Sequence, residues 1–579
     1  MVTKVNISAE ARQYVRQRLH ADSTRDLAKR TLLTLIDQNS VPCEDVSETC
    51  RREREAFGVI EDFVRNEIGR SWEYEYVPVD PAIEKRPEYT VPRYVRNSGA
   101  QAPSANAIYA NRYNLLVRKL ENGNQTRTLA FNSHIDCVAP HFTHTIQGDE
   151  IRGRGATDAK GQCTAMLLAA KTLAEVHEQY GLGPNAEICL QFVIDEEIGG
   201  NGSLSLALDS SRNYDGVVVC EPTELRLHPA HRGALWYEID LSCNDPGVNA
   251  TSVASHVLIQ LRADGESLRE ESSHPLFPHR PVQTCNGVFG EWGEHPSEVC
   301  PAVGIVITCP NTLGLDRKKL LTEKIHEECT KATNLYTQNY GDKARGTQPL
   351  IDQHFSLYPI DSGIYVEFTG HAGHMGKIRE LDCAATKAAY AISSLDTALR
   401  EYPPGTSVYL ARRRSDQEMD DLPVNGIRPL KDSANRIKLE GGQGFLPTHS
   451  IDEIREWIRN SVRLSLTEYC QHRGLSPTAV KAQVSFDRLH NDAYECSTES
   501  REMVAAQEAA RLARAKGDQP IQGFDVSCDA RLFANMRSDC EVITFGAGSL
   551  TEAHSDNESV DMDQIITCAE VLAYLGLAY

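Results

Sequence analysis

Five segments of the sequence place histidine or acidic residues at or just after the end of an apolar run. They are His134 and Asp136 in FNSHIDCVAP, Asp158 in GRGATDAKG, Glu196 and Glu197 in FVIDEEIGGNGS, Glu221 in VVVCEPT, and His554 in FGAGSLTEAHSDNE. Ligand sites of open α/β sheets collect where parallel strands end. Imidazole and carboxylate groups without cysteine favour Zn²⁺ or another borderline metal in an open, hydrolytic type of site.

Two imidazoles and three carboxylates are enough ligands for two metal ions if one carboxylate bridges them. Two ions about 3.5–4 Å apart can polarise a carbonyl and lower the pKa of a shared water towards about 7. Such a reaction also needs a proton acceptor that is not a ligand, and the adjacent Glu196 and Glu197 offer one candidate ligand and one candidate base. Taken singly, each residue is more often a structural histidine or an acidic group at a helix N-terminus, so the signal is their joint occurrence.

The elements that must position these residues predict an α/β domain. Short apolar runs at YNLLVRKL, TLAFNSHID, EICLQFVID and YDGVVVCEPT predict strands, and residues 163–180 predict a crossover helix. Strand, helix and strand in succession favour a mainly parallel sheet. Near the C-terminus, CEVITFGAG predicts a strand and residues 562–579 a closing helix. Upstream, residues 8–38 and 46–68 have the pattern of amphipathic helices.

From His231 the pattern changes. ALWYEIDLS predicts a strand, and a long stretch rich in Pro, His and Cys precedes the next predicted strand at 363–370. Helices are predicted over 383–402 and 449–470, and strands with two helices indicate a split βαβ lid domain. The expected domains are a catalytic domain in two parts, 1–230 and 486–579, and a lid at 231–485 that carries an extra insertion at about 243–360.

Composition narrows the classes of function. The 81 Asp and Glu residues outnumber the 60 Lys and Arg residues, so the formal net charge is −21, and binding to DNA or RNA is not expected. No apolar run approaches the roughly 20 residues of a membrane span, and the N-terminal residues do not resemble a secretory signal peptide. We therefore expect a cytoplasmic protein without a membrane partner. The 17 cysteines form no CxxC pair and are predicted to be reduced core residues.

Taken in order, the motifs resemble those of the zinc metallohydrolases of the acetylornithine deacetylase, succinyl-diaminopimelate desuccinylase, aminoacylase and carboxypeptidase G family. The matching segments are SHIDCVAP, GRGATDAKGQ, DEEIGGNGS, EPT, GHAGHMG, and FGAG with EAHSDNE. The resemblance implies an α/β catalytic domain with a mixed, mainly parallel sheet. It also implies an inserted α+β lid of the ferredoxin-like, split βαβ kind.

The resemblance further implies a role for each residue of the site. One zinc ion would be held by His134 and Glu221, the other by Glu197 and His554, and Asp158 would bridge the two. The general base would be Glu196, and Asp136 would orient the His134 imidazole. The peptide bond from Asp158 to Ala159 would be cis. Because the ligands are nitrogen and oxygen only, Co²⁺ or Mn²⁺ could replace Zn²⁺.

Substrate contacts are implied in the same way. In GHAGHMG, His374 would reach the substrate carbonyl and stabilise the oxyanion, from this subunit or from a partner. The alternatives for this role are His371 and His256. In VSCDARLF, Arg531 would bind a substrate carboxylate through two hydrogen bonds, with a structural salt bridge as the alternative. Gly546 and Gly548 would let the backbone approach a ligand closely.

We therefore expect an enzyme that hydrolyses an amide bond of a small, carboxylate-bearing amide or short peptide. Deacylation of an N-acyl amino acid, as by acetylornithine deacetylase, is the first expectation, and a small-peptide carboxypeptidase or dipeptidase is the alternative. A non-catalytic binding or regulatory module on the same fold is disfavoured because every ligand and the base are present. The family implies a homodimer through the lid, and the insertion leaves open whether it replaces that contact, caps the site or forms a new interface.

Overall fold

The computed structural model describes most of the chain, in twelve stretches: residues 7–96, 103–119, 127–181, 186–245, 247–310, 313–340, 351–371, 373, 375, 382–412, 427–516 and 519–579. It divides into two compact units. The first comprises Met1–Arg232, Pro275–Phe277 and Asn491–Tyr579, and the second comprises Gly233–His274 and Pro278–His490. The domain limits given above stay predictions. In the structure the chain leaves the first unit after Arg232, returns to it briefly at Pro275–Phe277, and returns finally after His490.

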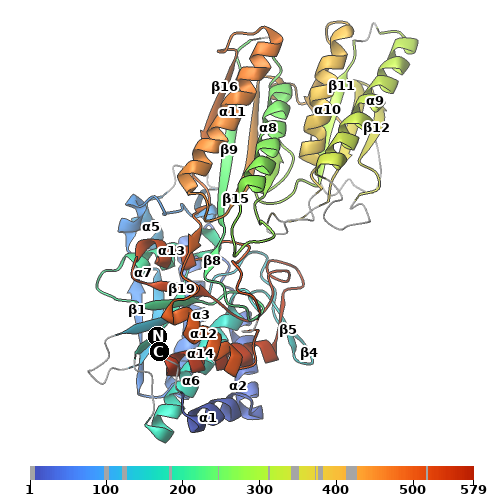
Figure 1. Ribbon diagram of the computed structural model, residues 1–579. Coiled ribbons are helices and arrows are strands. Elements are labelled where there is room, and N and C mark those ends of the chain that lie inside the picture. The colour runs from blue at the N-terminus through green and yellow to red at the C-terminus, as the bar shows by residue number, and fades with distance from the viewer. Residues whose placement is uncertain are drawn as a thin grey trace. The chain divides into compact units, whose positions relative to one another are not determined.

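The first unit is built on a six-stranded sheet (Figure 1). The strand order is β1 (Trp72–Pro78), β2 (Tyr113–Lys119), β6 (Glu187–Val193), β3 (Thr128–His134), β7 (Gly216–Val219) and β19 (Glu541–Thr544). The last four in this order run parallel to one another, while β1 and β2 pair antiparallel. Because β3, β6 and β7 are buried along almost their whole length, their sequences are continuous apolar runs rather than alternating ones. The predicted mixed, mainly parallel sheet is confirmed.

Helices surround this sheet and supply much of its core. They are α1 (Ala9–Leu19), α2 (Asp22–Asp37), α3 (Val46–Phe63), α4 (Arg93–Arg96), α5 (Ala105–Tyr109), α6 (Lys160–Tyr180), α7 (Asn201–Leu208), α12 (Arg501–Leu512), α13 (Ala530–Met536) and α14 (Met562–Ala578). Two neighbouring helices, α6 and α14, pack together and are buried along most of their length. The stretch 8–38 forms two helices rather than one, because the backbone at Ala21 is extended.

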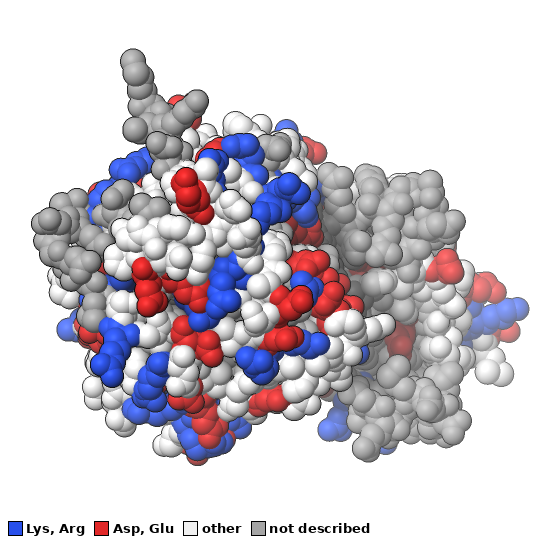
Figure 2. Space-filling view, turned by 90° about the horizontal axis from the view of Figure 1, so that it is seen from below, with Lys and Arg blue, Asp and Glu red and all other residues white. Residues whose placement is uncertain are grey.

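Short strands complete the first unit. A three-stranded sheet joins β4 (Thr145–Gln147), β5 (Glu150–Arg152) and β20 (Ser559–Asp561), and β8 (Ala230–His231) pairs with β18 (Tyr494–Glu495). On the face drawn in Figure 2, acidic and basic side chains are interspersed over the described surface. Among the described residues, no helix combines the length and the apolar character that crossing a membrane requires. All 17 cysteines are free thiols.

The second unit contains two βαββαβ motifs. The first consists of β9 (Gly233–Cys243), α8 (Ala250–Glu271), β10 (Thr284–Phe289), β15 (Arg436–Phe445), α11 (Ile451–Arg473) and β16 (Val480–Ser485), with β17 (His490–Asn491) beside β9. The second consists of β11 (Ala302–Thr308), α9 (Leu315–Asn339), β12 (Phe355–Ile360), β13 (Gly363–Thr369), α10 (Ala384–Ala398) and β14 (Ser407–Leu410). Both sheets are antiparallel. If the strands of each motif are numbered along the chain, their order across the sheet is 2-3-1-4, which is the ferredoxin-like arrangement expected for the lid.

The second motif interrupts the first between β10 and β15. The insertion is predicted at about 243–360, directly after the first lid strand, but α8 and β10 belong to the first motif and lie inside that range. The difference arises because strand pairing, not local composition, decides which motif an element completes. The helices α11, α8, α10 and α9 pack in one row, so the two motifs share a single helix layer (Figure 1).

Candidate metal centre

The predicted ligands lie at one edge of the sheet of the first unit. His134 is the last residue of β3, and Asp158 lies just before α6. The loop after β6 carries both Glu196 and Glu197, the loop after β7 carries Glu221, and the loop after β19 carries His554. Because these four strands are parallel and adjacent, their carboxyl ends bring the loops together. The residues are separated by up to several hundred positions in the sequence, and the parallel sheet is what joins them.

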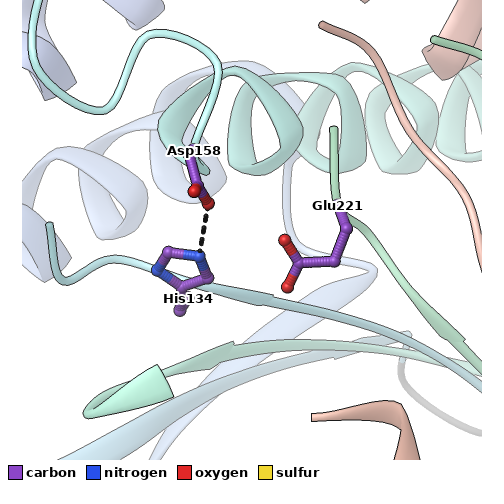
Figure 3. Close-up of side chains that lie close together, drawn as sticks. All are labelled: His134, Asp158 and Glu221. Atoms are coloured by element: carbon purple, nitrogen blue, oxygen red, sulfur yellow. Dashed lines mark hydrogen bonds and ion pairs between the residues drawn. The ribbon is translucent and has the colours of Figure 1, made fainter. Parts of the chain in front are cut away.

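Two groups of ligand atoms share Asp158. The first group is His134, Asp158 and Glu221, shown in Figure 3, and the second is Asp158, Glu197 and His554. Within each group the ligand atoms lie within 4.8 Å of one another. His134 Nε2 is 3.0 Å from Asp158 Oδ1, and His554 Nε2 is 3.2 Å from Asp158 Oδ2. Each oxygen of Asp158 therefore faces a different histidine, as a bridging carboxylate requires.

The arrangement fits two divalent cations. Two ligand atoms on one tetrahedral zinc ion lie about 3.4 Å apart when each is about 2.1 Å from the ion, close to the spacing seen here. Buried oxygen atoms of Glu197 and Glu221, the Oε1 atom of each, have no hydrogen-bond partner among the described residues. Burial raises the pKa of Glu221 well above its usual range, because a carboxylate there lacks compensating charge. A bound cation would supply that charge.

Asp136 contacts the His134 imidazole mainly through its backbone oxygen. His134 Nδ1 lies 2.9 Å from the backbone oxygen of Asp136 and 3.7 Å from its carboxylate. If Nδ1 donates to that backbone oxygen, the lone pair of Nε2 is left for a metal ion. The Asp136 carboxylate instead accepts the backbone N–H groups of Glu196 (3.3 Å) and Glu197 (3.2 Å). It is fully buried, which raises its pKa to about 7.

The loop that carries Asp158 is held from the C-terminal part of the chain. The bond from Asp158 to Ala159 is cis, as the resemblance implies. Glu558 accepts the backbone N–H groups of Thr157 and Asp158, both at 3.1 Å, and pairs with Arg154 at 2.8 Å. Sequence reasoning missed Glu558, although it is the last residue of the quoted EAHSDNE segment.

Gly546 and Gly548 approach other loops of the site. A Cβ atom on Gly548 would lie 1.7 Å from Thr157 Oγ1, and one on Gly546 would lie 2.5 Å from the backbone oxygen of Glu221. Gly548 also has a φ of +81°, in the left-handed region that favours glycine. In the described structure the two glycines let the FGAG segment pack directly behind the Asp158 and Glu221 loops.

Arg531 is buried and contacts the turn that follows Glu197. Its Nη1 donates to the backbone oxygen of Cys528 (2.8 Å), and its Nη2 donates to that of Gly199 (2.9 Å). Asp529, which sequence reasoning also missed, is buried beside it, and burial raises the pKa of this carboxyl group. The signal for Asp529 was the same VSCDARLF segment that singled out Arg531.

The three histidines considered for the oxyanion role do not lie together among the described residues. His374 lies outside the described residues. His371 pairs with Asp382 in an isolated β-bridge. His256 lies on α8, where its ring packs against the Tyr469 ring at 5.1 Å and its Nε2 is 3.3 Å from Ser393 Oγ. These contacts place His256 in the helix layer of the second unit.

Glu196 is half-buried at the metal centre and is not in either ligand group. Burial, and then repulsion from Glu221, raise the pKa of Glu196 well above its usual range. Bound cations would oppose that rise by stabilising the carboxylate form. The position thus suits a group that accepts and releases a proton.

The sequence is similar to those of known peptidases. A model of peptidase family M20/M25/M40 matches residues 130–577. A probable carboxypeptidase of Emericella nidulans is 32% identical over 134 residues, which are 20% of this chain and 30% of that protein. A probable carboxypeptidase of Aspergillus terreus is 37% identical over 174 residues, 27% of this chain and 39% of that protein. The matched segments thus span about a third of these curated relatives.

Two solved structures resemble the whole chain. Human carnosine dipeptidase 1 has a TM-score of 0.52 at 15% identity, covering 98% of this chain and 99% of that one. The di-peptidase Dug1p of Saccharomyces cerevisiae has a TM-score of 0.53 at 11% identity, covering 99% of both chains. At these identities the similarity is one of fold alone.

Proposed function

The chain belongs to peptidase family M20/M25/M40, and from this premise we propose that it hydrolyses a peptide or amide bond with two zinc ions. The observation that carries the proposal is Asp158, whose two oxygens face His134 and His554 from the two ligand groups. A small peptide with a free carboxylate is the proposed substrate, and the curated relatives named as probable carboxypeptidases support it. Deacylation of an N-acyl amino acid is the second candidate, favoured by the GATDAKG and EPT motifs.

In this proposal some side chains bind the metal ions and others transfer protons or position the ligands. His134 and Glu221 hold one ion, Glu197 and His554 the other, and Asp158 both. When bound, the two ions polarise the scissile carbonyl and lower the pKa of a shared water. Glu196 accepts a proton from the attacking water and delivers it to the leaving amine, because it lies beside the ligands without belonging to either group. Asp136 holds the N–H groups of the turn that carries the two glutamates.

Arg531 stays our candidate for binding the substrate carboxylate. Each terminal nitrogen of its guanidinium uses one N–H group on a backbone oxygen, and Nη1 also lies 3.9 Å from Asp529 Oδ1. The second N–H group of Nη2 is therefore the one we propose for a substrate carboxylate. A cytoplasmic location and a homodimer through the lid also stay proposals. Cell fractionation and the mass of the protein in solution would test them.

A panel of matched substrates tests the proposed function. Dipeptides and tripeptides with a free C-terminal carboxylate should be hydrolysed, and the same peptides with a C-terminal amide should be hydrolysed more slowly, mainly through a higher KM. N-acetyl, N-succinyl and N-formyl amino acids test the second candidate in the same assay. Equal kcat/KM for free and amidated peptides would contradict recognition of the carboxylate, and no turnover of any substrate by zinc-loaded protein would contradict the enzyme itself.

Replacement of the lid histidine gives a second test. His374→Ala should lower kcat by about 10²-fold or more with little change in KM, because an oxyanion donor acts mainly in the transition state. His256→Ala is the control, since His256 packs inside the helix layer and should change stability rather than kcat. An unchanged kcat in His374→Ala together with a loss in His371→Ala would transfer the role to His371.

A further inference from the structure

A strained residue directly precedes the two glutamates of the metal centre. Asp195 has φ 64° and ψ 27°, in the left-handed region, and begins the turn Glu196–Ile198. Few residues other than glycine adopt this conformation, and it persists where the surroundings hold it in place. The side chain of Asp195 is fully buried, so its carboxylate must be paired within the protein.

That partner is Arg112, in the segment just before β2. Its Nη1 donates to Asp195 Oδ2 at 2.9 Å, and its Nη2 donates to Asp195 Oδ1. Tyr109 Oη also donates to Asp195 Oδ2, at 2.8 Å. Both carboxylate oxygens are thus occupied, and the forked contact with a planar guanidinium fixes the direction of the side chain as well as its position.

Arg112 is itself held from the far side by α3. Its Nε donates to both carboxylate oxygens of Glu53 at 3.1 Å, and its Nη1 also donates to Tyr94 Oη at 2.6 Å. The side chains of Arg112, Glu53 and Asp195 are at most 3% exposed. A buried ion group of this kind contributes little net stability, but its hydrogen bonds fix a geometry.

Further contacts fix the rest of the turn. Asp136 accepts the N–H groups of Glu196 and Glu197, and Arg531 donates to the backbone oxygen of Gly199. With Asp195 held by Arg112, the turn is fixed at its start, in its middle and at its end. Neither Arg112 nor Asp195 belongs to a ligand group, so their contacts act through the neighbouring glutamates.

We propose that Arg112 is a positioning residue: by holding Asp195 in the left-handed conformation, it directs Glu197 to the second metal ion and Glu196 to the substrate side. The proposal rests on the proposed roles of those two glutamates. It assigns a function to Glu53 and α3 as well, since they hold the arginine in place. Residues that support the ligands of a metal site typically alter metal affinity or activity by about 10- to 100-fold when replaced.

Three substitutions of Asp195 distinguish an effect on the position of Glu196 and Glu197 from an effect on the stability of the fold. Asp195→Asn keeps a side chain that tolerates the left-handed region and one oxygen that accepts from Arg112, while its NH₂ group meets a donor, so kcat should fall less than in the glycine variant. Asp195→Gly adopts the conformation freely but loses the anchor, so kcat should fall at least about tenfold with little change in KM. Asp195→Ala should lose activity similarly and also unfold at a lower temperature than the glycine variant. In each of these variants Arg112 keeps Glu53 as a charged partner.

Zinc binding supplies a readout that does not depend on turnover. Titration of metal-free protein with Zn²⁺ against a coloured chelator should show the weaker ion bound about tenfold less tightly in Asp195→Gly and weakened by a smaller factor in Asp195→Asn. Arg112→Gln with Glu53→Gln in one chain tests the arginine directly and should behave as Asp195→Gly does. Arg127→Gln is the control, because Arg127 pairs with Glu502 at the opposite end of the sheet and should leave kcat and zinc binding unchanged.

The outcomes distinguish this inference from the proposed function. Parent-like kcat and zinc binding in Asp195→Gly would overturn the inference while leaving the hydrolase intact. If the parent binds two ions but hydrolyses none of the substrates, the proposed function fails, and weaker zinc binding by Asp195→Gly would still support the positioning role. Should the double variant not fold, the Asp195 series alone decides.

Discussion

Replacing Glu196 with Gln should reduce kcat by about 10²- to 10⁴-fold while both metal ions stay bound. Glutamine has nearly the same shape and hydrogen-bonding reach, but it cannot accept the proton of the attacking water. Glu196 is in neither ligand group, and its backbone N–H stays bound to Asp136 whatever its side chain. Steady-state kinetics on the best substrate of the panel, with metal content by elemental analysis, would measure both effects. A loss above this range is consistent with one residue serving both proton transfers.

Glu197→Gln provides the contrast. Glu197 Oε2 lies 3.0 Å from His554 Nε2 within the second ligand group, so this variant should lose metal as well as activity. Glu178→Gln, on the exposed end of α6, is the matched control and should change neither quantity. Loss of metal in Glu196→Gln with retained metal in Glu197→Gln would show that the roles of the two glutamates are exchanged.

The resemblance to the zinc metallohydrolase family is confirmed by the family match over residues 130–577. The residues at the ends of the strands were predictable because each lies in a short motif whose position relative to an apolar run is local information. His134 after TLAFNS and Glu221 after GVVVC are examples, and the parallel order of β3 and β7 then brings them together. The comparisons do not show the acetylornithine deacetylase-like specificity that was the first expectation, and the two curated relatives described above are named as probable carboxypeptidases.

The second βαββαβ motif could not be predicted in the same way. Its strand β11 pairs with β13 and β14, which lie far along the chain beyond α9. Local patterns indicated strand 363–370 and helix 383–402 correctly, as β13 and α10. They did not indicate that these elements complete a separate sheet, because pairing depends on contacts of large sequence separation.

The contacts that fix the turn of Glu196 and Glu197 are another example. Arg112 and Asp195 are 83 residues apart, and Arg112 and Glu53 are 59 apart. In sequence, each is an ordinary charged residue in a chain that is 24% charged. Only the fold shows that the three are buried together, where an unpaired charge would be costly. Residues that bind a metal have recognisable types, whereas residues that position them do not.

Replacing Asp158 with Asn should remove the bridge, so that at most one ion stays bound, and should reduce hydrolysis to below about one thousandth of the parent, since the two ions supply several kcal/mol of transition-state stabilisation. An asparagine side chain has one oxygen and one NH₂ group, so it can offer a lone pair to only one of the two ions. In the structure the two oxygens of Asp158 face His134 Nε2 and His554 Nε2 separately, and both contacts are needed for a bridge.

The measurement is metal content after dialysis against metal-free buffer, followed by kinetics with and without added Zn²⁺. Asp561→Asn is the control, because Asp561 is an exposed cap of α14 that asparagine can replace, and this variant should keep both ions. Chelator treatment of the parent should reproduce the loss, and added Zn²⁺ should restore activity to the parent but not to Asp158→Asn. Retention of both ions by Asp158→Asn would show that Asp158 does not bridge them. Retention of a single ion with full activity would show that hydrolysis needs only one ion, so the second ligand group would then have another role.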